Sequence, residues 1–450
     1  MTSYEPIIGL EVHVELNTKS KMFCRCSADY FGKEPNTHTC PVCLGLPGAL
    51  PYINEQAIDD CIKIGLALNC KISEKSIFER KNYFYPDLPK GYQISQYRWP
   101  LCINGHLTLD SGQVVRINRV HQEEDTGKLL HTGRGLIAQG GVTMIDFNRS
   151  GVPLVEIVTE PDFTDVEEVR DYAKKLQQLF RYLEVSNADM ERGDMRLEAN
   201  VSVRKSNGHP GGGRLDLPNY RVELKNINSF RFMVAAVEYE IKRQIQALEK
   251  GEKLSQETRG WDEDKKVTYL QRSKEEANDY RYFPEPDLPE LRIDKLRVKN
   301  LRLSLPELPW EKVKRYLELG INKAQAQILS ASKELAQFFE TAAEHGKKHE
   351  VSVQEVANYI INRKPGITLV LPTQVIEEIK RKTVGVIVDE SQLGNLAKQA
   401  IQENPKSAAD YKAGKVAAMQ ALIGAVMRLS QGKADSGKTK QLLEKLLQDN

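Results

Sequence analysis

The chain has 450 residues, 28% of them charged and 40% hydrophobic, and its formal net charge is +2. Such a composition is that of a globular protein with about two to four domains, and the net charge favours no class of partner. No apolar run is long enough to cross a bilayer, and the first expected strand leaves no room for a signal or transit peptide. We therefore expect a soluble, cytoplasmic protein that makes no membrane contact.

The first expected element is a strand over residues 8–16, IGLEVHVEL. Strict alternation places its apolar residues on a core face and Glu11, His13 and Glu15 on the opposite face. Two carboxylates beside an imidazole suit a divalent cation. An ordinary exposed strand face is the alternative, and this segment alone favours it.

Four of the seven cysteines lie close together, and they are Cys24, Cys26, Cys40 and Cys43. Two close pairs separated by a turn-rich stretch can form the closed tetrahedral site of a structural zinc ion. The first pair is CxC instead of CxxC and His38 is a spare candidate ligand, so unligated buried thiols are the alternative. We expect a zinc knuckle over residues 24–43 that does no chemistry.

Residues 81–97, KNYFYPDLPKGYQISQY, are expected to form an ordered loop, because two prolines in so short a segment remove amide donors and restrict their neighbours. The segment is both polar and aromatic. Surface packing is the alternative to a binding role, but these are the groups that hold a nucleotide or a polar substrate: Lys81, Tyr83, Tyr85, Lys90, Gln93 and Gln96.

A second strand over residues 114–125 ends in three consecutive acids, Glu123, Glu124 and Asp125. After a glycine-rich connection, a strand over residues 152–158 carries Glu156 within an apolar run. A carboxylate buried there needs a cation or a hydrogen-bonded partner. The sequence thus predicts a magnesium cluster, made of Glu11, His13, Glu124 and Glu156.

Two helices and two further strands follow. The first helix is expected to begin with a capping box, Thr164 to Glu167, and the second to be capped by Ser229 and to end before Gly251. Between them, strands joined by the turn HPGGG should pair antiparallel. Their polar faces carry Glu198, Asn200, Glu223 and Lys225, for which cross-strand ion pairs are the commoner explanation.

From residue 295 onward, amphipathic helices replace the strands, and the longest are expected over residues 323–346 and 408–429. The sequence predicts an α+β fold with three parts. These are an antiparallel-sheet domain with the zinc knuckle (1–294), a helical domain (295–385) and a small helical tail (386–450). A mild excess of Lys and Arg in the tail suits a nucleic-acid contact.

Residues 432–439, GKADSGKT, match the phosphate-loop pattern G-x-x-x-x-G-K-[ST] letter for letter. A helix precedes them instead of a strand, and too few residues follow to build a βαβ unit. We interpret the match as a coincidence, with Gly432 ending one helix and Ser436 or Gly437 beginning the last.

Long segments of the chain, in order, resemble the B subunits of the tRNA-dependent amidotransferases that make Gln-tRNA and Asn-tRNA by the indirect route. They are IGLEVHVEL, TCPVCLGLPGALP, KNYFYPDLPKGYQISQY, HQEEDTGKL, NRSGVPLVEIVTEPD, ELKNINSFRF, QETRGWD and RSKEEANDYRYFPEPDLP. The resemblance implies a cradle of antiparallel sheet and helices, a helical domain and a tail that contacts tRNA. It also implies a ligase reaction, in which ATP phosphorylates the side-chain carboxylate of a misacylated glutamyl or aspartyl residue and ammonia then attacks it.

The resemblance also implies cofactors, partners and residue roles. The cofactors are ATP, Mg²⁺ and structural Zn²⁺, and the partners are misacylated tRNA, the A subunit, which is an amidase, and the small C subunit. Glu11, His13, Glu124 and Glu156 match the magnesium positions, the four knuckle cysteines match the zinc site, and Lys81 with Glu124 matches the mouth of the ammonia path. We expect substrate and cofactor contacts from Tyr83, Lys90, Gln93, Glu198, Asn200, Glu223 and Lys225.

Two departures from the family pattern stand out. Leu197-Glu198 replaces a usual Cys-Asp, and the stretch between Asn362 and Asp389 is shorter than the family norm. Two other classes of protein are alternatives. A zinc-containing RNA-binding protein without catalytic activity leaves the acidic strand faces unexplained, and a metal-dependent hydrolase lacks an arrangement that offers its nucleophile.

Overall fold

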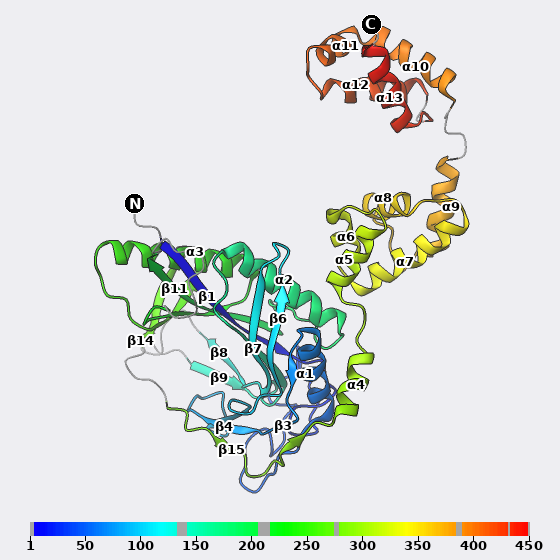
Figure 1. Cartoon of the computed structure of the whole chain (residues 1–450). Coiled ribbons are helices and arrows are strands. Elements are labelled where there is room, and N and C mark those ends of the chain that lie inside the picture. The colour runs from blue at the N-terminus through cyan, green and yellow to red at the C-terminus, as the bar shows by residue number, and fades with distance from the viewer. Residues whose placement is uncertain are drawn as a thin grey trace. The chain divides into compact units, whose positions relative to one another are not determined.

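The computed structural model describes residues 4–132, 142–205, 217–273, 279–383, 389–430 and 433–448 (Figure 1). The chain divides into two compact units, Met1–Lys312 and Val313–Asn450. The expected glycine-rich connection at 133–141, the HPGGG turn and Gly432 lie outside the described residues.

A nine-stranded sheet forms the centre of the first unit. Its strand order is β14-β13-β12-β11-β1-β10-β7-β6-β2, and every neighbouring pair is antiparallel except β12 and β13. In that order, the strands span Val267–Ser273, Glu257–Asp262, Val222–Ile227, Met195–Lys205, Tyr4–Glu15, Pro153–Thr159, Val114–Glu124, Cys102–Thr108 and Lys71–Ile72. The α+β prediction is confirmed, and so is the antiparallel pairing of β11 with β12.

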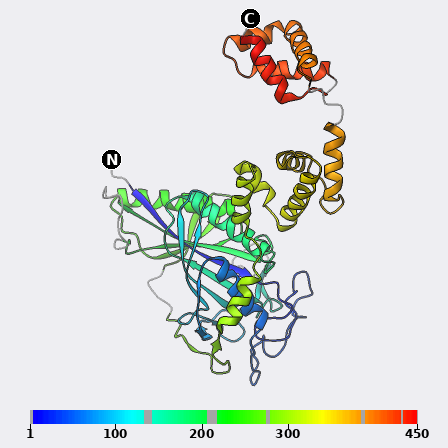
Figure 2. The same cartoon turned by 45° about the vertical axis from the view of Figure 1, so that its right-hand side comes forward.

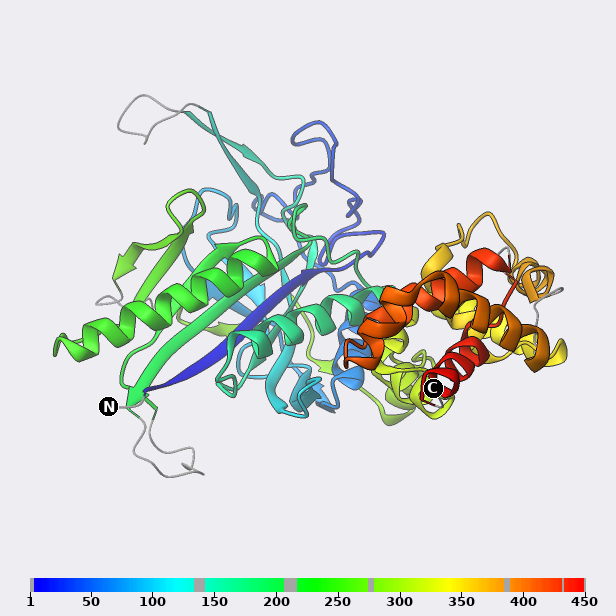
Figure 3. The same ribbon diagram turned by 90° about the horizontal axis from the view of Figure 1, so that it is seen from above.

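One face of this sheet forms the main core. The even-numbered residues of β1, from Ile8 to Val14, are at most 1% exposed and belong to the same hydrophobic cluster as residues of α1 (Glu55–Ala67), α2 (Val166–Tyr182) and α3 (Phe230–Glu249). Figure 3 shows β1 beside β11, with α2 and α3 over them. Burial of one such side chain stabilises the fold by roughly 1.5–3 kcal/mol. The odd-numbered residues from Glu11 to Glu15 are therefore on the polar face.

Side-chain caps fix where these helices begin. Asn54 and Ser229 accept hydrogen bonds from backbone amides of the first turns of α1 and α3, and the cap at Ser229 is the one that the sequence predicts. The capping box of α2 is displaced by one residue from the expected Thr164 to Glu167, because Asp165 is the cap and Glu168 returns the bond to its backbone. Either residue type can cap, so only the backbone geometry decides between neighbours.

Short strands frame the polar face. They are β3 (Lys75–Ser76), β4 (Glu79–Asn82), β5 (Tyr92–Ser95), β8 (Lys128–Thr132), β9 (Val142–Asp146), β15 (Phe283–Pro284) and β16 (Leu291–Arg292). Strands β4 and β5 pair antiparallel, so the expectation of loop throughout residues 81–97 is wrong at both ends. The prolines lie in the connection between the two strands, where no ladder hydrogen bond is lost.

The remaining elements are helices. They are α4 (Lys295–Leu303), α5 (Pro309–Glu318), α6 (Lys323–Leu329), α7 (Lys333–Lys348), α8 (Val353–Arg363), α9 (Pro372–Thr383), α10 (Glu390–Glu403), α11 (Pro405–Lys412), α12 (Ala418–Leu429) and α13 (Ser436–Gln448). Figure 2 shows α4 against α1 in the first unit. No helix among the described residues is both long and apolar enough to cross a membrane.

Two of the expected long helices are each divided. The helix expected over residues 323–346 breaks where Ser332 caps α7, and the one expected over 408–429 breaks near Gly414, whose φ is +89°. Hydrophobic residues of the second unit form two clusters, one within residues 316–379 and one within 393–447. Because α4 packs on the first core, the first unit extends past residue 294. The three-part division stays a prediction.

Candidate active site on the carboxylate-rich sheet face

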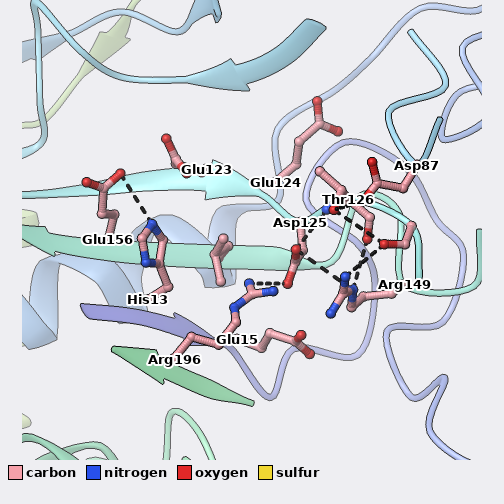
Figure 4. A network of polar contacts seen from close by, with 12 residues as sticks. His13, Glu15, Asp87, Glu123, Glu124, Asp125, Thr126, Arg149, Glu156 and Arg196 are labelled. Carbon is pink, nitrogen blue, oxygen red and sulfur yellow. Dashed lines mark hydrogen bonds and ion pairs between the residues drawn. The ribbon is translucent and has the colours of Figure 1, made fainter. Parts of the chain in front are cut away.

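Pairing of β1, β10 and β7 brings acidic and imidazole side chains together on the polar face. His13 lies opposite Glu156 in the ladder, and Glu156 lies opposite His121. Nε2 of His13 is 3.7 Å from Oε2 of Glu156, and Nε2 of His121 is 3.3 Å from the same oxygen. Figure 4 shows His13 directed at Glu156, with Glu123 nearby. His13, Glu123 and Glu156 could together hold a metal ion.

The charges in this group depend on one another. Burial by itself lowers the pKa of His13, but the hydrogen bond and charge of Glu156 raise it to about 9. Burial likewise opposes ionisation of Glu156, yet His121 and His13 hold its pKa well below the ordinary value. Without a cation the imidazolium groups therefore balance the carboxylates. A divalent ion could replace them as the counter-charge.

Glu11 lies in a second group, two residues before His13 on the same strand. It faces Glu198 across the β1–β11 ladder, and with Glu198 and Glu223 it forms another arrangement able to hold a metal. Asn200 Nδ2 donates to Glu11 Oε1 at 2.9 Å. Lys225 Nζ lies 2.9 Å from Glu198 and 3.3 Å from Glu223. Burial first, and then the charge of Glu156, raises the pKa of Glu11.

Glu124 belongs to neither group. Its Oε1 accepts from Lys90 Nζ at 2.5 Å and from the Ile94 backbone N–H at 3.0 Å. Both partners are on or next to β5, so the carboxylate is turned toward the 81–97 segment. Gln93 Nε2 donates to Glu123 Oε2 at 3.1 Å and to the backbone carbonyl of Glu124 at 2.7 Å, so it holds the Glu123 carboxylate and not that of Glu124.

Lys81 is enclosed by aromatic rings. Its Nζ lies 5.7 Å from the Tyr83 ring centroid and 5.4 Å from that of Tyr280. Burial opposes the charge of Lys81, but Glu123 raises its pKa well above the ordinary value. The charge of Lys81 is thus balanced by Glu123, and the Glu124 expected beside it pairs with Lys90.

The structure therefore brings together some of the predicted residues and separates others. Of the four expected magnesium ligands, His13 and Glu156 share a group, Glu11 lies in the adjacent one, and Glu124 lies apart. Glu123 and His121 also lie in this group, although the sequence analysis does not predict them as metal ligands. Their signal was available, because His121 and Glu123 alternate on β7 as His13 and its acidic neighbours do on β1.

A third network of buried charges adjoins the site (Figure 4). Asp125 Oδ2 accepts from Arg196 Nη2 at 2.5 Å, and its Oδ1 lies 3.8 Å from Arg149 Nε. Tyr30 donates to Glu15 Oε2 at 2.9 Å. Burial and the charge of Asp125 raise the pKa of Glu15 well above its ordinary value. Glu15 therefore keeps its proton more readily than an ordinary carboxyl group does, whereas its neighbour Asp125 ionises more readily.

The four cysteines of the knuckle converge as predicted. Their four Sγ atoms all lie within 4.8 Å of one another. The Sγ atoms of Cys40 and Cys43 are 3.8 Å apart, which is the separation of about 3.8 Å that tetrahedral zinc requires with bonds near 2.3 Å. The pKa of Cys43 is lowered to about 5, mainly by a hydrogen bond from Cys24. Burial opposes this shift, and the charge of Lys21 adds to it. The donor set fits a zinc ion.

A cavity of about 200 Å³ separates the knuckle from the Lys90–Glu124 pair. Its walls include Cys24, Cys43, Lys90, Tyr92 and Glu124. The knuckle is thus one wall of a space whose other wall is the buried acidic end of β7. A structural metal at the knuckle would fix the shape of that cavity.

Comparison with known proteins places the chain in a family. Residues 6–299 match the GatB/GatE catalytic domain, and residues 331–447 match the GatB domain. Relatives named as the B subunit of an aspartyl/glutamyl-tRNA(Asn/Gln) amidotransferase match over almost their full length. The relative from Thermotoga maritima is 43% identical, and the alignment covers 99% of this chain and 99% of the relative. The relative from Thermosipho melanesiensis is 44% identical, and the alignment covers 99% of this chain and 100% of the relative.

The relative from Dehalococcoides mccartyi is 43% identical over an alignment of 500 positions that covers all of both chains. That alignment is longer than this chain, so the relative has residues that the chain lacks. The position of this shortening, expected between Asn362 and Asp389, stays a prediction. Two matched domains and full-length similarity leave one conclusion. The chain belongs to the B subunits of the aspartyl/glutamyl-tRNA(Asn/Gln) amidotransferases, a family of ligase subunits.

Proposed function

We propose that the chain activates the side-chain carboxylate of Glu-tRNA(Gln), Asp-tRNA(Asn) or both for amide formation. A carboxylate oxygen attacks the γ-phosphorus of ATP, and ADP leaves. Ammonia then attacks the acyl phosphate carbon, and phosphate leaves. Membership of the family supports this reaction, and the carboxylate-rich sheet face is the observation on which its location rests.

Phosphoryl transfer depends on positioning and on charge neutralisation more than on covalent catalysis. The group of His13, Glu123 and Glu156 offers one nitrogen and two carboxylates within 4.8 Å, a donor set that Mg²⁺ accepts. Magnesium bound there would neutralise charge on the transferring phosphoryl group. Glu11, Glu198 and Glu223 adjoin this group and would hold a second cation or the substrate with Asn200 and Lys225.

Glu124 and Lys90 have a different proposed role. Their ion pair closes one side of the cavity beside the knuckle, and Gln93 links Glu124 to the neighbouring Glu123. A partly closed space whose wall includes Glu124, the neighbour of Glu123 in the chain, suits the passage of ammonia. We assign this pair to the end of the ammonia path, with Lys81 and Tyr83 near the activated carboxylate.

The same proposal includes partners and a second metal. Ammonia would come from the amidase, which is the A subunit, and the small C subunit would complete a heterotrimer. Misacylated tRNA would bind as substrate in the cytoplasm. Zinc at the four cysteines would be structural, since four thiolates leave no open position on the metal.

Adjacent acids on β7 give a matched pair of variants. Glu123→Gln should reduce Mg²⁺-dependent formation of ADP from ATP on Glu-tRNA(Gln) by roughly 100-fold or more, because a charged ligand is lost from the metal group. Glu124→Gln should leave phosphorylation within a few-fold of normal and impair amide formation from glutamine in the assembled complex. Both rates are measured on the same preparations, with tRNA binding as a control.

Equal phosphorylation by Glu123→Gln and the unaltered protein would show that this group does not hold the catalytic magnesium. No ATP consumption on any misacylated tRNA, with or without the amidase partner, would instead favour a zinc-containing RNA-binding protein without catalytic activity.

A further inference from the structure

Lys21 is a buried lysine that no step of the proposed reaction uses. It is 0% exposed and lies between the first strand and the knuckle. Its Nζ donates to the carbonyl of His38 at 2.7 Å, to the carbonyl of Phe147 at 3.4 Å, and to Cys43 Sγ at 3.7 Å. The three donors of the ammonium thus have three acceptors.

None of these acceptors is a carboxylate. Among the described residues, no Asp or Glu forms an ion pair with Lys21. Of the three acceptors only the Cys43 sulfur can carry a negative charge, and an ammonium ion buried without a counter-charge is strongly unfavourable. A zinc ion with four thiolates carries a net negative charge of roughly two units and provides that counter-charge.

The surroundings hold the ammonium in place at the sulfur. The Lys21 backbone N–H donates to the Cys26 carbonyl at 2.9 Å, so the lysine is part of the knuckle's own turn. Gly151 lies beside both residues, because a Cβ built there would be in ordinary contact with Cys43 Cβ at 3.5 Å and with the Lys21 side chain at 3.6 Å. Ser150 Oγ donates to the Cys43 carbonyl at 3.1 Å. These contacts place the lysine side chain and Cys43 side by side in the interior.

We propose that Lys21 is a positioning residue of the zinc site: its ammonium donates a hydrogen bond to the Cys43 thiolate and neutralises part of the charge of the zinc–thiolate group. The inference rests on the zinc proposed above for the four cysteines. Donors to a metal-bound ligand tune its affinity and its reactivity. A zinc-bound thiolate that accepts such a hydrogen bond attacks electrophiles more slowly. It is also replaced by other ligands on the metal less readily.

The test uses the full-length chain and two variants. Lys21→Met keeps the length and apolar stem of the side chain but removes its charge. Asn148→Ala is the matched control, because Asn148 anchors the knuckle through the His38 N–H and the Glu34 carbonyl without touching a sulfur. Zinc content, the rate of zinc transfer to a chelator, and the cysteine first modified by iodoacetamide are measured for each.

Lys21→Met should release zinc roughly 10- to 100-fold faster than the unaltered chain, with Cys43 as the first cysteine alkylated. Asn148→Ala should change the release rate much less and should not favour Cys43. Equal acceleration by both variants, or none by Lys21→Met, would overturn the inference while leaving the zinc proposal intact. Absence of zinc from the reduced, freshly purified unaltered chain would remove the zinc proposal and this inference together.

If Lys21→Met does not fold, the double variant Lys21→Met/Cys43→His keeps the test decisive. Histidine is a neutral zinc ligand, so it removes one negative charge in exchange for the lost positive one. The double variant should regain folding and zinc content relative to Lys21→Met alone, as a coupled pair requires. Failure to regain either would overturn the role of Lys21.

Discussion

At the scale of single residues, the site is a set of buried charges whose states depend on their partners. Glu156 is ionised because His13 and His121 face it, whereas Glu15 is protonated because Asp125 is the ionised member of their pair. Two carboxyl groups on one polar face thus differ in charge. Burial alone would raise the pKa of both, so the difference comes from specific neighbours.

Glu15→Gln tests the protonation of Glu15. The folded-state pKa of Glu15 lies well above the ordinary value of 4.5, so the folded chain keeps a proton that the unfolded chain releases. That contribution to stability is complete below pH 4.5 and is lost as pH rises through the folded-state pKa, by about 1.4 kcal/mol per pH unit. Glutamine cannot ionise and should not show this loss.

Between pH 5 and 8, urea unfolding of the unaltered first unit should therefore lose more stability with rising pH than unfolding of Glu15→Gln does. Asp125 stays ionised across this range, because arginines hold its pKa below the ordinary value, so it does not contribute to the difference. Parallel pH profiles for the two proteins would show that Glu15 is already ionised in the folded chain.

At the scale of elements, strand pairing and helix caps set the positions of the site residues. Register between β1, β10 and β7 places His13 opposite Glu156 and Glu156 opposite His121. Helix α2 supports this sheet from the core face, and Phe180, Leu179 and Leu176 on it are fully buried. The beginning of α2 is exposed, so its cap can be altered without touching the core.

Asp165→Ala should destabilise the first unit by about 1 kcal/mol, because the Glu167 backbone N–H loses its acceptor and the capping box with Glu168 is broken. Thr164→Ala is the control, since Thr164 precedes the cap. Urea unfolding followed by circular dichroism measures both. A loss of stability in Thr164→Ala that matches that of Asp165→Ala would place the cap at residue 164, as the sequence pattern alone suggested.

At the scale of the whole molecule, the acidic sheet face and the phosphate-loop match in the tail belong to different units. The first lies within Met1–Lys312 and the second within Val313–Asn450. Helix α12, not a strand, precedes the match, and α13 begins at Ser436. Asp435 Oδ1 accepts from the Lys438 backbone N–H at 2.7 Å, as a helix N-cap does. The described end of the match, from Ser436 onward, therefore begins a helix, as expected for a coincidental match.

Lys438→Ala should leave ATP consumption at saturating misacylated tRNA unchanged. Lys438 is exposed at the start of α13, so its loss should at most weaken tRNA binding modestly. The salt dependence of that binding should become less steep by about one unit, as for one lost phosphate contact. A collapse of ATP consumption would move the nucleotide site to the tail.

Much of this architecture was predictable from the sequence. Alternation in residues 8–16 identified the strand and its polar face, because a strand turns successive side chains to opposite sides. Cysteine spacing identified the knuckle, and Ser229 was identified as the cap of α3. A run of long motifs in order identified the family, which the comparisons confirm. Each of these signals is local, or is a pattern repeated along the chain.

Only the tertiary structure decided which side chains meet. Glu123 and Glu124 are adjacent acids with equal claims in the sequence, but β7 pairing with β10 and the bonds from β5 direct Glu123 to the His13 group and Glu124 to Lys90. Lys21 belongs to no pattern, and only folding shows that its ammonium lies against Cys43. Periodicity assigns a residue to a face, but its partners depend on the register between strands and on loops that are distant in sequence.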